Sequence, residues 1–132
     1  MFGFFKRLFK KEELQIEKLE EGLTTERSYQ KHVNEIFQGL IEHRLPDATR
    51  VDIVTDDLAI EIDFARKWYE AIGQACHYGS SLKKKPAILL IVRSPEDEKY
   101  VAAAKRVCSK TKISIDGQDY HIVLFVYRDI KG

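Results

Sequence analysis

A run of six apolar residues at positions 87–92 (AILLIV) constrains the fold of this chain more than any other segment. An unbroken apolar run of this length is typical of a strand that is buried on both faces, whereas a strand with one wet face alternates apolar and polar residues. Helical patterns precede and follow the run, at residues 65–81 and 95–110. We therefore expect a layered α/β domain in which helices flank a mixed sheet.

Two further strands are predicted before the first of these helices. Segments 49–55 (TRVDIVT) and 58–64 (LAIEIDF) are rich in Val and Ile, and Thr55-Asp56-Asp57 supplies a tight turn between them. The two segments should therefore form an antiparallel hairpin. Alternation along the second strand places its large apolar residues on one face and two acids, Glu61 and Asp63, on the other.

The remaining elements complete the predicted order α-β-β-α-β-α-β. The apolar spacing of residues 26–45 predicts a helix with Thr25 as its N-cap and Ser28 three residues later, and Pro46 should end it. Residues 112–129 are expected to be strands, with Asp116-Gly117 as a hairpin turn.

Length and charge limit the possible functions. The chain has 132 residues, which suits one domain of ordinary size, and a net charge of +1. A strongly basic coat for nucleic acid is therefore excluded, and phosphate binding would need local clusters of Lys or Arg. No apolar stretch approaches the roughly 20 residues that span a bilayer, and charges interrupt the N-terminal apolar run too early for a secretory signal. The expected location is cytoplasmic.

The first 22 residues have a pattern of their own and are predicted to be an arm outside the domain at 23–132. In MFGFFKRLFKK the apolar residues fall on one half of a helical wheel and the basic residues on the other. Such a helix either lies on a membrane surface, docks on a partner, packs on its own domain or frays.

Acidic residues gather on the predicted hairpin. Asp52 and Glu61 lie on partner strands within about 5 Å of each other, and Asp63 shares the face of Glu61. Three carboxylates so close repel one another and are costly to bury unless a cation joins them. Mg²⁺ or Mn²⁺, bound through one or two carboxylates, water and a substrate phosphate, is the cofactor that this pattern favours.

The helix that follows the hairpin extends this predicted site. Lys67, Glu70, Gln74 and Tyr78 form one polar stripe, and Lys67 begins it next to the acids. A Lys there is able to neutralise a carboxylate, hold an attacking water or stabilise charge on a phosphate. At the end of the helix, the cluster Lys83, Lys84 and Lys85 is either a solvated loop or a phosphate contact.

These residues resemble the PD-(D/E)xK nuclease superfamily. The resemblance consists of Asp52, of Glu61 nine residues later on the next strand, and of a helix with Gln74-Ala-Cys-His-Tyr78. The Gln-x-x-x-Tyr element is similar to that of the branch with recombination-associated exonucleases, and the similarity covers about residues 25–126. It implies a restriction-endonuclease-like mixed sheet flanked by helices, and a metal-dependent nuclease with DNA as its partner.

The resemblance also implies roles for single residues. Asp52 and Glu61 match the two metal-binding acids, and the carbonyl of Ile62 matches a backbone metal ligand. Glu26 matches a helical acid that completes the metal site through water, although an acid there also favours the helix dipole. Gln74 and Tyr78 match residues that contact DNA phosphate or orient the site.

One position departs from the family pattern. Asp63 stands where the family has its Lys, two residues after Glu61, and Lys67 is the obvious substitute for the catalytic lysine. Asp63 either binds a second metal ion or marks a domain that has lost its chemistry. The two functions predicted are thus a Mg²⁺-dependent nuclease and a catalytically inactive domain that binds nucleic acid or a protein partner. A domain this small is also a candidate for a homodimer.

Overall fold

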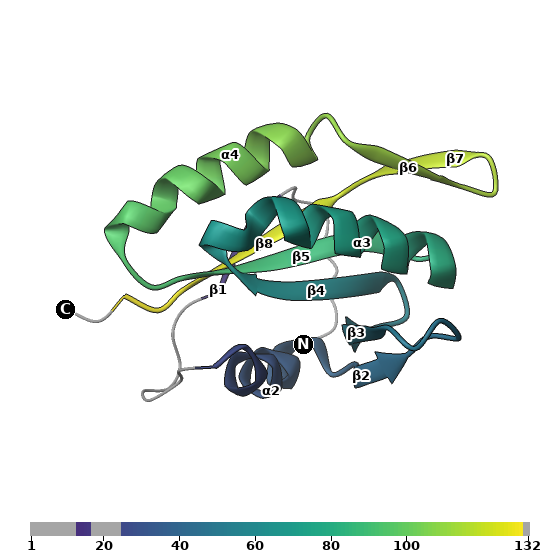
Figure 1. The fold of residues 1–132 in the computed structure, drawn as a ribbon, viewed down its shortest axis with the longest axis horizontal. Coiled ribbons are helices and arrows are strands. Elements are labelled where there is room, and N and C mark those ends of the chain that lie inside the picture. The colour runs from purple at the N-terminus through teal and green to yellow at the C-terminus, as the bar shows by residue number, and fades with distance from the viewer. Residues whose placement is uncertain (1–12, 17–24, 131–132) are drawn as a thin grey trace.

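The computed structural model describes residues 13–16 and 25–130, and shows an α/β domain with helices on both faces of a mixed sheet (Figure 1). Its helices are α2 (Glu26–Phe37), α3 (Trp68–Leu82) and α4 (Glu98–Cys108), with 3-10 turns at Ala65–Lys67 and Pro95–Asp97. Its strands are β1 (Glu13–Ile16), β2 (Leu40–Arg44), β3 (Arg50–Val54), β4 (Leu58–Phe64), β5 (Lys85–Val92), β6 (Lys112–Ile115), β7 (Gln118–His121) and β8 (Val123–Arg128).

The main sheet has the strand order β1-β8-β5-β4-β3-β2. Strands β1, β8, β5 and β4 run parallel to one another, whereas β3 is antiparallel to both β4 and β2. Helices α3 and α4 cover one face and α2 the other, while β6 and β7 form a separate hairpin at one end (Figure 1). The prediction of a mixed sheet between helices is confirmed.

Strand β5 is buried on both faces, as its unbroken apolar run predicts. Ala87, Leu89 and Ile91 join the core cluster beneath α2, and the alternate residues join the cluster beneath α3 and α4. The predicted β3–β4 hairpin is confirmed as well, with Ile53 opposite Ile60. This hairpin carries the predicted acids and passes directly into α3.

Two local predictions are confirmed in detail. Thr25 caps α2 in a reciprocal capping box, in which Thr25 and Ser28 each accept a bond from the other's backbone N–H. Asp116 and Gly117 form the turn between β6 and β7 with φ angles of 49° and 82°. Positive φ at both central residues is what a tight two-residue hairpin requires.

The prediction of one helix over residues 26–45 is wrong, because α2 ends at Phe37 and β2 follows it. Gln38 adopts a left-handed conformation with φ 54°, and the side chain of Asn34 bonds both the N–H and the carbonyl of Gly39. An added Cβ on Gly39 would lie 2.4 Å from the carbonyl oxygen of Val54. Glycine therefore lets the chain turn tightly and lay β2 against β3, which helical spacing alone does not reveal.

The structure describes only part of the predicted N-terminal arm. Residues 13–16 form β1, which pairs in parallel with β8 at the edge of the main sheet. The basic amphipathic pattern at residues 1–11 lies outside the described residues. In the parts of the chain that are described, each helix is too short or too polar to cross a bilayer.

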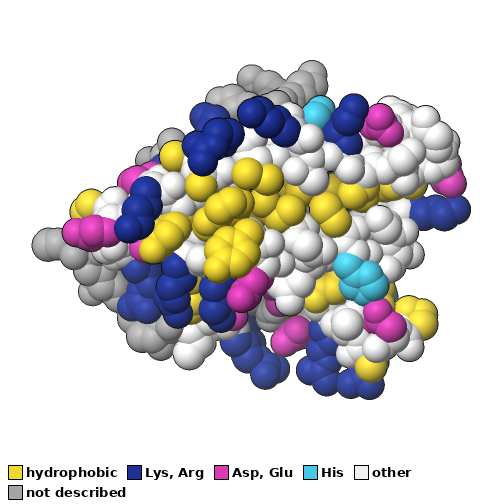
Figure 2. Space-filling view, turned by 45° about the horizontal axis from the view of Figure 1, so that its top comes forward, with side chains coloured by type: hydrophobic (Ala, Val, Ile, Leu, Met, Phe, Trp, Pro, Cys, Tyr) yellow, Lys and Arg dark blue, Asp and Glu magenta, His cyan; other side chains and the backbone are white. Residues whose placement is uncertain are grey.

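The face formed by α3 and α4 carries an apolar strip bordered by basic side chains (Figure 2). Trp68, Ile72, Cys76 and Tyr100 are the partly buried residues that pack on the core at this face. Trp68 and Ile72 thus face the core.

A candidate metal site at the fork between β3 and β4

The site is built where β3 and β4 separate. Their ladder pairs Ile53 with Ile60 and Val54 with Ala59, a register that sets Asp52 opposite Glu61. One residue further along β4, the backbone N–H of Ile62 donates to Asp52 Oδ2 at 2.7 Å. A side-chain carboxylate thus takes the place of a strand carbonyl, which ends the regular pairing and turns Asp52 toward β4.

The carbonyl of Ile62 faces the same fork. In a strand, the N–H and C=O of one residue point to the same side, and the N–H of Ile62 points at Asp52. The side chain of Ile62 is buried in the core beneath α2. The predicted backbone ligand and the predicted acid Asp52 are therefore brought together.

Four carboxyl groups form a chain of contacts at this fork. Glu61 is within hydrogen-bond reach of both Asp52 and Asp63, and Asp63 reaches Glu26 at the start of α2. Glu61 and Asp63 are buried, with exposed fractions of 7% and 5%. The structure thus gathers all four acids that the sequence nominates as metal ligands.

Burial and mutual repulsion raise the pKa values of Asp52, Glu61 and Asp63 and so favour their protonated forms. Burial raises the pKa of Glu61 to about 11, with the neighbouring Asp52 carboxyl adding to the effect. Burial and the carboxyl of Glu26 raise the pKa of Asp63 to about 8. The pKa of Asp52 is raised too, first by burial. Without a cation, the cluster therefore retains protons at neutral pH.

Lys67 stands at the edge of this cluster. It closes the 3-10 turn between β4 and α3, and its Nζ lies 3.8 Å from Glu26 Oε2, with both side chains about 40% exposed (41% and 38%). Its charge favours the ionised form of Asp63. The predicted substitute lysine thus reaches the acids through Glu26.

The two predicted phosphate contacts on α3 differ in their surroundings. Tyr78 is buried against β3 and β4, and burial together with the charge of Glu61 raises its pKa to about 12. Gln74, one turn earlier, is exposed. Tyr78 therefore lies within electrostatic reach of the acids, while Gln74 faces solvent on the same helix.

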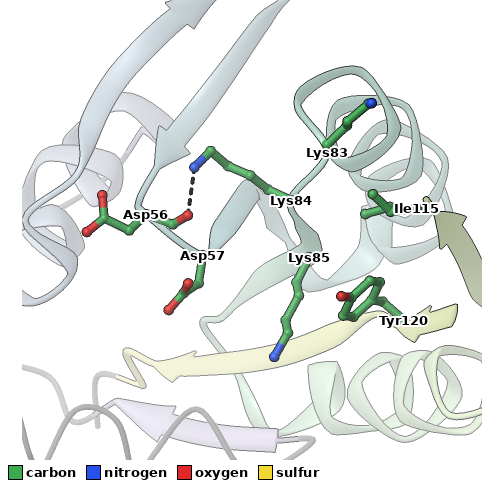
Figure 3. A pocket seen from close by; sticks show the side chains of 7 residues that line it. All are labelled: Asp56, Asp57, Lys83, Lys84, Lys85, Ile115 and Tyr120. Carbon is green, nitrogen blue, oxygen red and sulfur yellow. Dashed lines mark hydrogen bonds between the residues drawn. The ribbon is translucent and has the colours of Figure 1, made fainter. Parts of the chain in front are cut away.

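The three lysines after α3 lie apart from the acids. Lys83, Lys84 and Lys85 line a shallow pocket together with Asp56, Asp57, Ile115 and Tyr120 (Figure 3). Lys85 pairs with Leu58 at the start of β4, so the carboxyl of Asp63 is five residues, or roughly 17 Å, further along the strand.

Each of these lysines has a local contact at this pocket. The Nζ of Lys83 lies 3.2 Å from Asp116 Oδ1, and Lys84 Nζ donates to the carbonyl of Asp56 at 2.7 Å (Figure 3). Lys85 Nζ lies 5.8 Å from the centroid of the Tyr120 ring. Contact of these lysines with nucleic acid stays a prediction.

Two polar residues beside Asp52 were not found from the sequence. Gln30 donates from Nε2 to Asp52 Oδ1 at 3.0 Å, and Glu42 lies opposite Asp52 in the β2–β3 register with φ 55°. The spacing of four between Glu26 and Gln30 places both on one helical face and was a usable signal. No sequence signal pointed to Glu42, because the apolar spacing of its segment is that of a helix.

Within the described residues, no three His, Cys, Asp or Glu side chains already have the arrangement of a metal site. Mg²⁺ needs fewer than three protein side chains, since it binds one or two carboxylates and keeps several waters. Carboxylates and a backbone carbonyl are the hard oxygen ligands that Mg²⁺ and Mn²⁺ prefer. The donor set at the fork therefore fits such a cation.

Comparisons of the chain with models of protein families, with curated proteins and with solved structures found no match. The resemblance to PD-(D/E)xK nucleases consequently depends on the residues at the fork and on α3.

Proposed function

We propose that this protein is a metal-dependent nuclease that hydrolyses DNA phosphodiester bonds on a restriction-endonuclease-like fold. The observation that carries this proposal is the fork at Asp52, where a carboxylate bonded to the N–H of Ile62 stands opposite Glu61. The Ile62 carbonyl lies on the same side of β4 as Asp52, and two further acids, Asp63 and Glu26, follow Glu61. A buried cluster of this composition is unfavourable without a cation, so its presence supports a site for Mg²⁺ or Mn²⁺.

The residues around the fork have distinct roles in this proposal. Asp52, Glu61 and the carbonyl of Ile62 would hold the cation, and Asp63 and Glu26 would complete the site directly or through water. A cation held there would supply polarisation of the scissile phosphate and a lowered pKa for a bound water. Lys67, whose Nζ lies beside Glu26, moves from there toward the substrate and places a positive charge where negative charge develops on the phosphate.

The helix α3 and the loop after it supply the proposed DNA contacts. Exposed Gln74 offers an amide to a phosphate, and Tyr78 orients the acids from the hydrophobic side. Lys83, Lys84 and Lys85 contact the backbone at the far end of β4. The distance between these lysines and the acids suits a DNA strand that runs along α3. Contacts of the lysines with its phosphates set the position of the DNA without reading its sequence.

A second candidate function is a catalytically inactive domain of the same fold that binds nucleic acid or a protein partner. The observation in its favour is Asp63, a buried acid at the position where the resembled family carries its catalytic Lys. Lys67 compensates only if it moves from Glu26 toward the substrate.

Cleavage assays with single- and double-stranded DNA in Mg²⁺ or Mn²⁺ separate the two functions. We expect the wild type to cleave, and Asp52→Asn to abolish cleavage. Lys67→Met should lower the rate about 100-fold or more while Mn²⁺ binding persists. Lys110→Met, an exposed substitution after α4, is the matched control and should cleave as the wild type does. If the wild type cleaves no faster than Asp52→Asn, the nuclease function is refuted.

A further inference from the structure

Gln30 is a buried side chain whose amide nitrogen has a hydrogen-bond partner among the described residues and whose amide oxygen has none. Its exposed fraction is 3%, and its Nε2 donates to Asp52 Oδ1 at 3.0 Å. Its Oε1 is buried and has no hydrogen-bond partner among the described residues. An unpaired buried acceptor loses its hydrogen bond to water without compensation, so such atoms are uncommon in native proteins and call for a specific reason.

The chemistry of the neighbours explains why this oxygen is unpaired. Asp52 accepts from the N–H of Ile62 at Oδ2 and from Nε2 of Gln30 at Oδ1, so the NH₂ group of Gln30 faces Asp52 and its carbonyl oxygen is turned away from that acceptor. Glu26 lies one turn earlier on the same face of α2 and contacts Asp63. The Oε1 atom of Gln30 therefore lies buried near these acids without a donor among the described residues.

We propose that Gln30 is a positioning residue of the metal site, which holds Asp52 through Nε2 and accepts a hydrogen bond at Oε1 from a water on the cation. This inference rests on the proposed function, because it presupposes that the fork binds a cation. Mg²⁺ and Mn²⁺ bound by few protein ligands keep several waters, and these waters donate strongly. Residues that orient metal ligands in this way change metal affinity by about 10- to 100-fold when they are replaced.

Calorimetric titration of the full chain with Mn²⁺ tests the inference without relying on activity. Gln30→Met keeps the length of the side chain but removes both polar atoms, and should weaken Mn²⁺ binding about 10- to 100-fold. Gln30→Glu keeps an acceptor oxygen on the same stem and should bind more tightly than Gln30→Met. Gln118→Met makes the same exchange at an exposed position of β7 and should bind as the wild type does.

The outcomes separate the inference from the proposed function. Equal Mn²⁺ affinity of the wild type and Gln30→Met overturns the inference and leaves the metal site in place. A Gln30→Glu protein that folds, with a cooperative unfolding transition in EDTA, but binds no better than Gln30→Met overturns the role of Oε1. A wild type that binds no Mn²⁺ overturns the proposed function, and the inference with it.

Discussion

Replacing Glu61 by Gln should stabilise the cation-free protein at neutral pH, although it removes a proposed metal ligand. Glu61 is 7% exposed, and burial raises its pKa from 4.5 to about 11. The folded protein therefore keeps a proton on Glu61 that the unfolded chain releases above pH 4.5. The contribution of Glu61 to the free energy of unfolding is therefore most favourable below pH 4.5 and becomes less favourable as the pH rises toward 11. Gln mimics the neutral carboxyl and has no proton to lose.

The size of the effect follows from the pH interval. Each pH unit between the unfolded pKa and the assay pH costs about 1.4 kcal/mol for one proton. From 4.5 to an assay pH of 7.5 this amounts to about 4 kcal/mol, whereas at pH 5 it is about 1 kcal/mol or less. The variant should therefore gain most of its stability at the higher pH.

Urea unfolding in EDTA at pH 5 and pH 7.5 measures this difference. Glu70→Gln, at an exposed position of α3, makes the same exchange and should change the free energy of unfolding by less than about 0.5 kcal/mol. Excess Mn²⁺ should stabilise the wild type and not Glu61→Gln. If Glu61→Gln is destabilising, or if its effect is the same at both pH values, the reasoning about a buried protonated carboxyl is refuted.

Two further predictions concern the stability of the fold and are tested by urea unfolding. Gly39→Ala should destabilise the protein by about 1–3 kcal/mol, because its Cβ would meet the carbonyl oxygen of Val54. The control Gly73→Ala, in α3 with open space around it, should stabilise the protein by about 0.5–1 kcal/mol. Equal effects of the two substitutions would contradict the close approach at Gly39. Arg128→Met removes two 2.8 Å bonds to Glu98 and should cost no more than about 1 kcal/mol at pH 7. Since this pairing lowers the pKa of Glu98, the loss should shrink as the pH falls below 4.5, and a constant loss would refute it.

The parts of the fold with local or strongly periodic signals could be predicted from the sequence. The β3–β4 hairpin follows from alternation and a short polar turn, and β5 from its unbroken apolar run. The opposition of Asp52 and Glu61 also follows, because a tight turn sets the register of the strands it joins.

The strand β2 could not be predicted, because its residues continue the helical spacing of α2. Its conformation depends on Gly39 lying against the Val54 carbonyl, a contact between segments that are far apart in the chain. The spacing of apolar residues along one segment does not predict such a contact. In the same way, Gln30 looks like an ordinary polar residue of a helix until α2 is placed beside Asp52.

The same distinction between local pattern and tertiary contact applies to the predicted site. The sequence alone determined that acids lie together on one hairpin and that Lys67 follows them at the start of a helix. Only the tertiary structure decided that Glu26 and Gln30 join this cluster, while Lys83–Lys85 lie at the other end of β4. The reason is that α3 runs back along the sheet over 15 residues, or roughly 22 Å, so its two ends face different parts of the molecule.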